Sequence, residues 1–323
     1  MRKRVFPALI LAVSMLALCA AGCSTSDKGA GKAVSSSSGR VSAASSPGPQ
    51  TSSGAPSQAQ SRAGSSAPSS QSSTAVVSTA TGSSQPGVTV YKTHAGIPVL
   101  CYHDIMLPAQ KGSVNNSLVM TTDQFDRQMA ILKNAGYTTI SFEQLKSYLI
   151  NGGDTRKKVV LTFDDGYKTS CTLGGPILRK YGFKATMFII AFHVNAPDTP
   201  ADLKHFSIQY VSRKDLDANS DVFTYASHTY NMHIDLRTQK NDALFKADLL
   251  RSRETLGGTT YFAYPSGEYN AKVEHTLRET GFQMAFTTHR RCAHKGENLF
   301  EIPRMEIYST LSEKGFEHQL GIL

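Results

Sequence analysis

The sequence predicts a parallel α/β fold for residues 91–323, as an open sheet or a closed barrel, and three observations support this. Short runs rich in β-branched and aromatic residues alternate with helical patterns, which is typical of parallel strands joined by covering helices. The region has roughly 230 residues, enough for one domain with a proper core. Polar residues directly follow several predicted strands, at the edge of the sheet where such folds bind ligands.

Capping signals place the first helices. Thr122 or Asp123 is expected to cap a helix that Gly136 ends. Ser141, with Gln144 three residues later, forms a capping box for the next helix, which runs through Leu149. Strands are expected at 97–102, 138–140, 158–163, 184–190, 222–226, 260–264 and 283–286, and further helices near 177–181, 242–256 and 271–280.

The first 90 residues are expected to lie outside this domain. An apolar run at 6–20 is shorter than the roughly 20 residues that span a membrane, and small residues precede Cys23, so 1–22 is predicted to be a secretory signal peptide. It resembles a bacterial lipoprotein signal with Cys23 lipidated, although Ala20 replaces the usual leucine; an uncleaved anchor is the alternative. Residues 23–90, rich in Ser, Ala, Gly and Pro, are predicted to form a disordered linker. The domain would then be exported and lipid-anchored at the cell membrane, facing the extracellular or cell-wall side.

Charge and cysteine content exclude some functions. The first 90 residues hold seven Lys or Arg and one acid, so they account for +6 of the net charge of +9. The remaining +3 gives no reason to expect a nucleic-acid partner. Cys101, Cys171 and Cys292 allow at most one disulfide in the domain, or are ordinary buried thiols, and their spacing suggests no cysteine zinc site.

Two adjacent carboxylates follow the predicted strand 158–163. Consecutive strand residues point to opposite faces, so Asp164 and Asp165 can share a site only if the backbone turns there, which Gly166 permits. A cation bound by one of them would leave the other free as a base. An ordinary Asp-Gly turn after a buried strand is the alternative.

A histidine pair follows the predicted strand 222–226. His228 and His233 are five residues apart, which on a helix would separate them by about 140°. They therefore need a loop to converge, and the polar residues around them favour one. A solvated surface pair is the alternative. Together with the strand-end carboxylates, the pair predicts a metal site and metal-assisted hydrolysis.

The sequence at this point resembles the polysaccharide deacetylases of the NodB-homology type, carbohydrate esterase family 4. Residues 162–166 match the family's first motif, Thr-Phe-Asp-Asp-Gly, and the histidines match its second, with Thr229 in the Ser/Thr place. The resemblance implies that Asp164 is the general base and that Asp165, His228 and His233 bind the metal.

One extra residue between the histidines, together with the opening sequence 98–103, resembles the branch that deacetylates poly-β-1,6-N-acetylglucosamine in biofilm matrices. This resemblance covers about 97–307 and implies a distorted (β/α) barrel with a circularly permuted order of elements. In that order His103, on the first strand, is the catalytic acid. A histidine that anchors a turn with Asp104 is the alternative, and His289 and His294 are weaker candidates.

The third motif departs from the family pattern. Ala263 stands where the family has an arginine that orients the base, while the stretch 264–267 keeps the proline and glycine. Arg304 is the candidate substitute, with a surface arginine as the alternative. Backbone N–H groups near Tyr264, Pro265, Ser266 and Gly267 are the expected substrate and oxyanion contacts.

These features predict removal of N-acetyl groups from an N-acetylglucosamine polysaccharide. Asp164 would accept a proton from water and His103 would protonate the departing amine. Zinc suits the ligand set, and cobalt, nickel or iron also fit it. Peptidoglycan is the alternative substrate, and a non-catalytic carbohydrate-binding lipoprotein is the alternative class; we expect a monomer. The domain lacks tryptophan, so an aromatic ring that stacks on a sugar would have to come from tyrosine or phenylalanine. Candidates are Tyr102, Tyr167, Tyr230 and Tyr264, unless these belong to the core.

Overall fold

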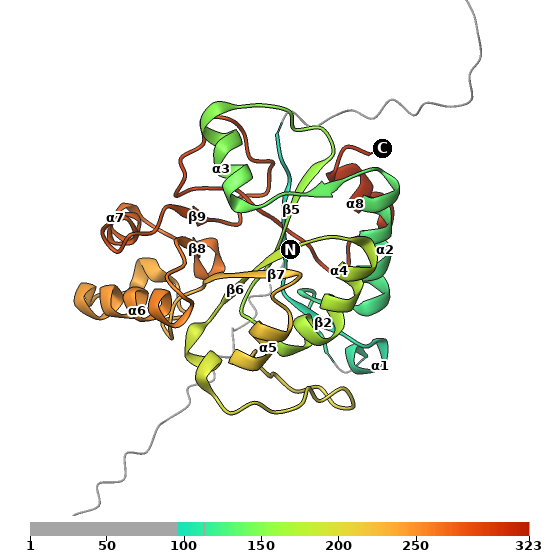
Figure 1. The fold of residues 1–323 in the computed structure, drawn as a ribbon, viewed down its shortest axis with the longest axis horizontal. Helices are drawn as coiled ribbons and strands as arrows, with labels where there is room; N and C mark the ends of the chain where they lie inside the picture. Colours follow the sequence, from blue (N-terminus) through green and yellow to red (C-terminus); the bar gives the residue numbers. More distant parts are fainter. Residues whose placement is uncertain (1–95, 113, 323) are drawn as a thin grey trace, which may run out of the picture. The chain divides into compact units, whose positions relative to one another are not determined.

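The computed structural model describes residues 96–112 and 114–322, so the predicted signal peptide, Cys23 and the linker lie outside the described residues. Within this part, one sheet of eight parallel strands dominates (Figure 1). Seven strands follow the order β10-β1-β5-β6-β7-β8-β9, and β4 pairs with β5. The strands are β1 (Val99–Tyr102), β4 (Thr138–Thr139), β5 (Lys158–Phe163), β6 (Ala185–Ile189), β7 (Phe223–Ser227), β8 (Tyr261–Ala263), β9 (Met284–Phe286) and β10 (Met305–Glu306).

A short segment near the C-terminus connects the two edges of this sheet. Ile302 forms a parallel bridge with Phe286 of β9, and three residues later Met305 pairs with Leu100 of β1. The sheet therefore curls, and 302–306 bridges its two edges, as expected for the distorted barrel that the family resemblance implies. A side chain on this segment can reach the barrel interior.

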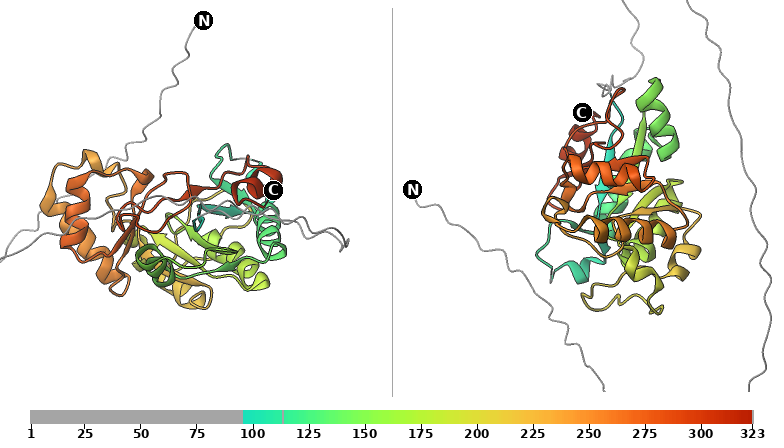
Figure 2. Two further views of the ribbon diagram at one scale, coloured as in Figure 1. Left: turned by 90° about the horizontal axis from the view of Figure 1, so that it is seen from above. Right: turned by 90° about the vertical axis from the view of Figure 1, so that its left-hand side faces the viewer.

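Helices cover the outside of the curled sheet (Figure 2). α2 (Thr122–Asn134) and α4 (Gly175–Tyr181) pack together beside β5 and β6. α6 (Asp242–Thr255) and α7 (Ala271–Glu279) cover the opposite end, beside β8 and β9 (Figure 1). The barrel interior is a separate apolar cluster, which includes Val99, Val160, Phe188, Ala226, Ala263, Phe286 and Ile302.

The capping signals largely hold. α3 (Phe142–Asn151) begins with the predicted box, in which the Ser141 side chain accepts from the backbone N–H of Gln144. The cap of α2 is Thr121, not Thr122 or Asp123, because Thr121 has the extended backbone that lets its hydroxyl accept from the N–H of Gln124.

Several elements lack a clear sequence pattern. A second sheet pairs β2 (Asp104–Met106) with β3 (Val119–Thr121), and α1 (Pro108–Lys111), α5 (Arg213–Ala218), α8 (Glu313–Gln319) and β10 complete the fold. All are seven residues or shorter, too short for a periodic pattern to stand out. Cys101, Cys171 and Cys292 are buried free thiols. Among the residues that the model describes, no helix combines the length and apolar character needed to cross a membrane.

Candidate metal centre and active site

The chain turns sharply where β5 ends. Asp165 has a φ of 69°, and the N–H of Gly166 donates to the carbonyl of Asp164 over 2.9 Å. A hydrogen bond spanning one residue of positive φ is a γ-turn of the rare, strained kind. Gly166 itself has a φ of 81° and leaves little room for a Cβ, which would lie 3.1 Å from Ile189. The turn ends the strand alternation, so the two carboxylates face different partners at one edge of the barrel.

Asp165 faces the histidine pair. Its Oδ1 lies 3.5 Å from Nε2 of His228 and 3.2 Å from Nε2 of His233. All three ligand atoms lie within 4.8 Å of one another. A tetrahedral ion with ligands at ~2.1 Å would separate neighbouring ligand atoms by about 3.4 Å. One oxygen and two nitrogens at these separations fit a divalent ion such as zinc, so these residues form a candidate metal centre.

The histidines converge because their loop is held at several points. Thr229 has a φ of 78°, so the chain reverses directly after His228. Asp248 of α6 then accepts hydrogen bonds from three successive backbone N–H groups, those of residues 230, 231 and 232, over 2.8, 2.8 and 3.0 Å. Ser252, one helical turn later, donates to the carbonyl of Thr229 over 3.2 Å. The sequence pattern gave no sign of Asp248, whose charge sits in an otherwise ordinary exposed helix.

One ring nitrogen of His228 is committed to the backbone. Its Nδ1 lies 2.8 Å from the carbonyl of Ala263, which requires a proton on Nδ1 and leaves the Nε2 lone pair for a metal. Burial lowers the pKa of His228, but the hydrogen bond to Asp165 and the nearby carboxylates outweigh it, so the pKa is raised. Burial likewise raises the pKa of Asp165, yet hydrogen bonds from both histidines hold it well below the usual value.

Asp164 points into the barrel and meets Arg304. The guanidinium donates from Nη1 to Oδ1 over 2.6 Å and from Nη2 to Oδ2 over 2.7 Å. Arg304 is fully buried, so its interpretation as a surface arginine is wrong. Its Nε donates to the carbonyl of Thr287 over 3.0 Å, which fixes the orientation of the guanidinium group. Burial raises the pKa of Asp164, but the Arg304 charge more than compensates and lowers it, so the carboxylate stays ionised.

His103 lies close to Asp164. A ring nitrogen of His103, the thiol of Cys101 and a carboxylate oxygen of Asp164 lie within 4.8 Å of one another. Within the described part of the chain, Nδ1 of His103 is buried without a hydrogen-bond partner. Ser170 donates to the His103 carbonyl over 2.8 Å and Thr169 donates to the Asp104 carboxylate, so this segment is tied to the chain after β5. His289 and His294 are exposed.

Two backbone N–H groups of the stretch 264–267 are already bonded within the chain. Tyr264 is fully buried: its hydroxyl donates to the carbonyl of Phe300 over 3.0 Å and its N–H to that of Phe286 over 3.0 Å. The N–H of Gly267 donates to the carbonyl of Tyr264 over 2.8 Å. Pro265 has no N–H, and Ser266 has a φ of 57°. The clear link between this region and the site is the Ala263 carbonyl, which orients His228.

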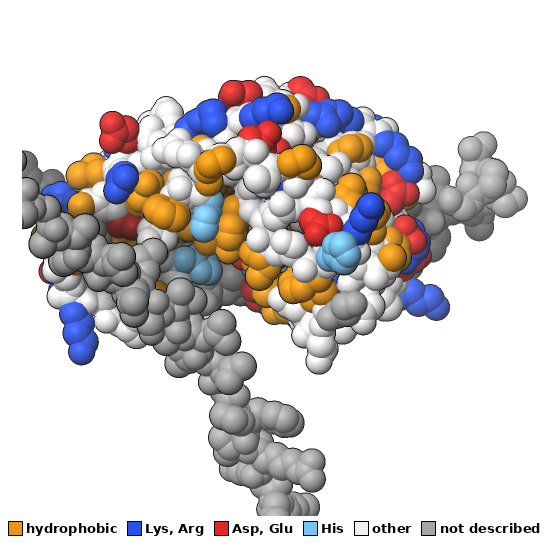
Figure 3. Space-filling model, turned by 90° about the horizontal axis from the view of Figure 1, so that it is seen from below, with side chains coloured by type: hydrophobic (Ala, Val, Ile, Leu, Met, Phe, Trp, Pro, Cys, Tyr) orange, Lys and Arg blue, Asp and Glu red, His pale blue; other side chains and the backbone are white. Residues whose placement is uncertain are grey.

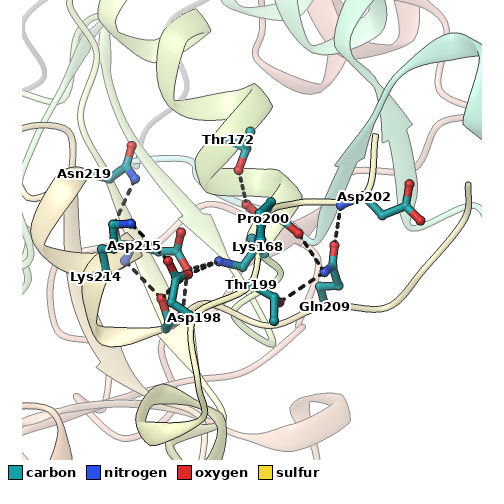
Figure 4. A network of polar contacts seen from close by, with 11 residues as sticks. Lys168, Thr172, Asp198, Thr199, Pro200, Asp202, Gln209, Lys214, Asp215 and Asn219 are labelled. Atoms are coloured by element: carbon teal, nitrogen blue, oxygen red, sulfur yellow. Dashed lines mark hydrogen bonds and ion pairs between the residues drawn. The ribbon is translucent and has the colours of Figure 1, made fainter. Parts of the chain in front are cut away.

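A long loop runs beside the Asp164–Asp165 turn. Lys168 is buried, and its ammonium lies 2.8 Å from Asp198 and 2.5 Å from Asp215 of α5 (Figure 4). The backbone N–H of Lys168 donates to the carbonyl of Gln209 over 2.8 Å. These contacts fasten residues 198–211 along the edge of the site. On the face seen from below, where α5 lies, histidine side chains sit among hydrophobic ones (Figure 3).

A curled parallel sheet with a candidate metal centre, and with the unligated carboxylate of Asp164 beside it at the carboxyl ends of the strands, is an arrangement suited to hydrolysis. Comparisons with known proteins name the family. The family model described as polysaccharide deacetylase matches residues 151–285. Over 229 residues the chain is 28% identical to YxkH of Bacillus subtilis (strain 168), by its name a candidate polysaccharide deacetylase, covering 69% of this chain and 75% of the relative.

The chain is also 26% identical over 213 residues to the poly-beta-1,6-N-acetyl-D-glucosamine N-deacetylase of Staphylococcus aureus (strain MRSA252), covering 62% of this chain and 70% of the relative. Among solved structures, the Streptococcus pyogenes deacetylase PplD in complex with acetate has a TM-score of 0.62 at 26% identity, covering 70% of this chain and 98% of that chain. The chain therefore contains a polysaccharide deacetylase domain, of the kind that hydrolyses N-acetyl amide bonds.

Proposed function

We propose that this deacetylase depends on a divalent metal ion, best zinc, and acts on poly-β-1,6-N-acetylglucosamine. The observation that carries the metal is the Asp165, His228 and His233 group, whose donor types and separations fit one ion. The substrate is supported by relatives named for it, such as the Staphylococcus aureus enzyme. The lipoprotein-like N-terminus supports anchoring through Cys23 at the outer face of the cell membrane, where an exopolysaccharide is accessible.

The reaction adds a water oxygen to the acetyl carbon, breaks the carbon–nitrogen bond and releases acetate and a free amine. A bound metal would lower the pKa of the attacking water and polarise the acetyl carbonyl. The water's proton passes to Asp164. Oδ2 of Asp164 already accepts from Arg304 and faces the Cys101 thiol at 3.5 Å, whereas Oδ1 accepts only from Arg304 among the described residues. A carboxylate oxygen has two lone-pair sites, so Oδ1 is the oxygen that takes the proton.

His103 supplies the proton that the departing amine needs. A ring nitrogen of His103 lies within 4.8 Å of a carboxylate oxygen of Asp164, and its Nδ1 has no partner within the described residues. A protonated imidazole at this position can donate to the amine nitrogen as the bond breaks. Base and acid are thus separate residues, and they directly follow the adjacent parallel strands β1 and β5.

The test measures acetate release from β-1,6-linked and β-1,4-linked N-acetylglucosamine oligomers and from peptidoglycan, with zinc, cobalt, nickel or iron. Faster release from β-1,6 oligomers is expected. Asp164→Asn should keep the metal and lose turnover, whereas His228→Ala should lose both. His275→Ala is the matched control, because His275 is exposed on α7. Unchanged metal content in both His228→Ala and His233→Ala would remove the ligand assignment, and a preference for peptidoglycan would overturn the substrate.

A further inference from the structure

Five aromatic rings form a row of successive contacts that begins and ends on segments next to the candidate metal ligands. Tyr167 stacks on Tyr210 with ring centroids 5.7 Å apart, and Tyr210 stacks on His193 at 3.8 Å with the rings 7° from parallel. Phe192 follows, edge-on to His193 at 5.4 Å and to Tyr230 at 5.8 Å. We call Tyr167, Tyr210, His193, Phe192 and Tyr230 the ring arc.

Both ends of the ring arc lie at metal-centre residues. Tyr167 comes two residues after Asp165, and Tyr230 two residues after His228. Tyr210 pairs with Tyr167 through an antiparallel bridge, and the N–H of Val211 donates to the carbonyl of Gly166 over 2.9 Å, so the middle of the arc also lies beside the turn that carries Asp165. The arc therefore borders the space where an acetylated sugar would bind.

The rings differ in what they leave open. Tyr210 is covered on its two faces by Tyr167 and His193, so neither face can receive a ligand. Tyr230 is 8% exposed, and the Arg251 guanidinium lies 4.2 Å from its ring centre. Phe192 is 48% exposed and has edge contacts to its neighbours in the arc. It is the ring of the arc with a large face toward solvent.

Phe192 is held firmly despite this exposure. Its N–H donates to the carbonyl of Tyr230 over 2.8 Å, and the N–H of Ala191 donates to the carbonyl of Thr229 over 3.0 Å. These bonds extend the pairing of β6 with β7 past the ends of both strands. Single exposed apolar residues are common on protein surfaces, and Ile150, which is 55% exposed on α3, is one. Phe192 differs because it is fixed at the rim of the site and continues a packed row of rings.

We propose that Phe192 binds a sugar unit of the polysaccharide next to the one that is deacetylated. This inference rests on the proposed function and names a second contact of the same site. A neutral N-acetylglucosamine ring has an apolar face of C–H groups, which suits an exposed aromatic face. Phe192 then favours longer chains, and it has no part in the chemistry at the acetyl group.

The experiment compares kcat/KM for acetate release from N-acetylglucosamine oligomers of one to six units, for the full-length wild type, Phe192→Ala, Phe192→Tyr and Ile150→Ala. Phe192→Ala is expected to lose about tenfold on the longer oligomers, the upper range for an aromatic contact, and nothing on the single unit. Phe192→Tyr should retain the length preference, and Ile150→Ala should match wild type throughout.

Equal losses for Phe192→Ala at every length would show that Phe192 supports the reacting site, and no loss at any length would show that no sugar contacts it. Either result overturns the proposal. A second measurement does not depend on turnover. It compares the affinity of the same oligomers for metal-loaded Asp164→Asn with their affinity for the double variant Asp164→Asn, Phe192→Ala. If wild type releases no acetate, the enzymatic proposal fails, while equal affinities of these two variants for a six-unit oligomer would independently refute the Phe192 contact.

Discussion

Replacing Asp248 by alanine should weaken metal binding, although Asp248 lies outside the metal centre. Its carboxylate accepts the backbone N–H groups of residues 230–232, the segment between His228 and His233. The nearby charge of Arg251 also stabilises the ionised form of Asp248, whose pKa burial raises. Alanine leaves three N–H groups without this acceptor, so they turn to bond with water. The loop that brings His233 to Asp165 then loses its fixed conformation.

The magnitude follows from the number and type of these bonds. A hydrogen bond to a charged group contributes about 1.5–3 kcal/mol. Adding three such values would overestimate the loss of metal affinity, because the three bonds are not independent. The bonds from Ser252 to Thr229 and from Phe192 to Tyr230 remain, at 3.2 and 2.8 Å, and hold the start of the loop. We therefore expect about 1.4–2.8 kcal/mol in metal affinity, which is the roughly 10–100-fold loss typical of residues that orient metal ligands.

The assay is metal titration against a chelator of known affinity, with acetate release measured at saturating metal. Glu254→Ala is the matched control, an exposed acid on the same helix. Asp248→Asn should lose less than alanine, because the amide retains one oxygen that can accept. Saturating metal should restore most of the turnover of Asp248→Ala. Unaltered affinity in Asp248→Ala, or a loss as large in Glu254→Ala, would refute the reasoning.

Three further predictions concern the proton-transfer residues and their surroundings. Arg304→Lys removes the two-pronged contact that lowers the pKa of Asp164, so the acidic limb of the pH–rate profile should move to higher pH, and a fixed limb would contradict this role. His103→Ala should abolish the basic limb of the same profile; a retained limb would exclude His103 as the acid. Asp104 is buried, and burial raises its pKa from 3.8 to about 6. Its carboxyl group therefore holds a proton more tightly in the folded state, and the free energy of unfolding should fall as the pH rises from 3.8 to about 6. Asp104→Asn should remove on the order of 3 kcal/mol of this dependence, measured by denaturant unfolding between pH 4 and 7; an unchanged dependence would contradict the assignment.

The residues at the strand ends were predictable because the neighbouring sequence determines where they lie in the fold. The run 158–163 is β5 with the same bounds, and a polar pair after such a strand in a parallel sheet must emerge at the ligand-binding edge. The convergence of the histidines was predictable as a requirement, since a helix could not provide it, but not as a mechanism. The acceptor that shapes the loop, Asp248, comes from a helix whose sequence shows only an ordinary polar position.

Platform residues were harder to predict than chemical ones. Tyr102 and Tyr264 were candidates beside Tyr167 and Tyr230, but the structure buries both in the core, where their hydroxyls donate to Gln128 and to the Phe300 carbonyl over 2.9 and 3.0 Å. Phe192, the exposed ring, lies in a short helical turn after β6 without any motif. Chemical roles restrict residue type and spacing, whereas a stacking face depends on which side of a ring the fold leaves open.

The contact between Arg304 and Asp164 shows how a distant element can supply a charge that the sequence motif leads us to expect from β8. Ala263 occupies the family's arginine position on β8, and its side chain lies in the barrel interior while its carbonyl orients His228. Arg304 reaches Asp164 from the segment that closes the barrel, 140 residues away in sequence. The interior of a closed sheet is a volume that every strand borders, so the same carboxylate can be reached from any of them. Local sequence patterns fix which residue an Asp-Asp-Gly turn presents, and the closure of the barrel decides which distant charge meets it.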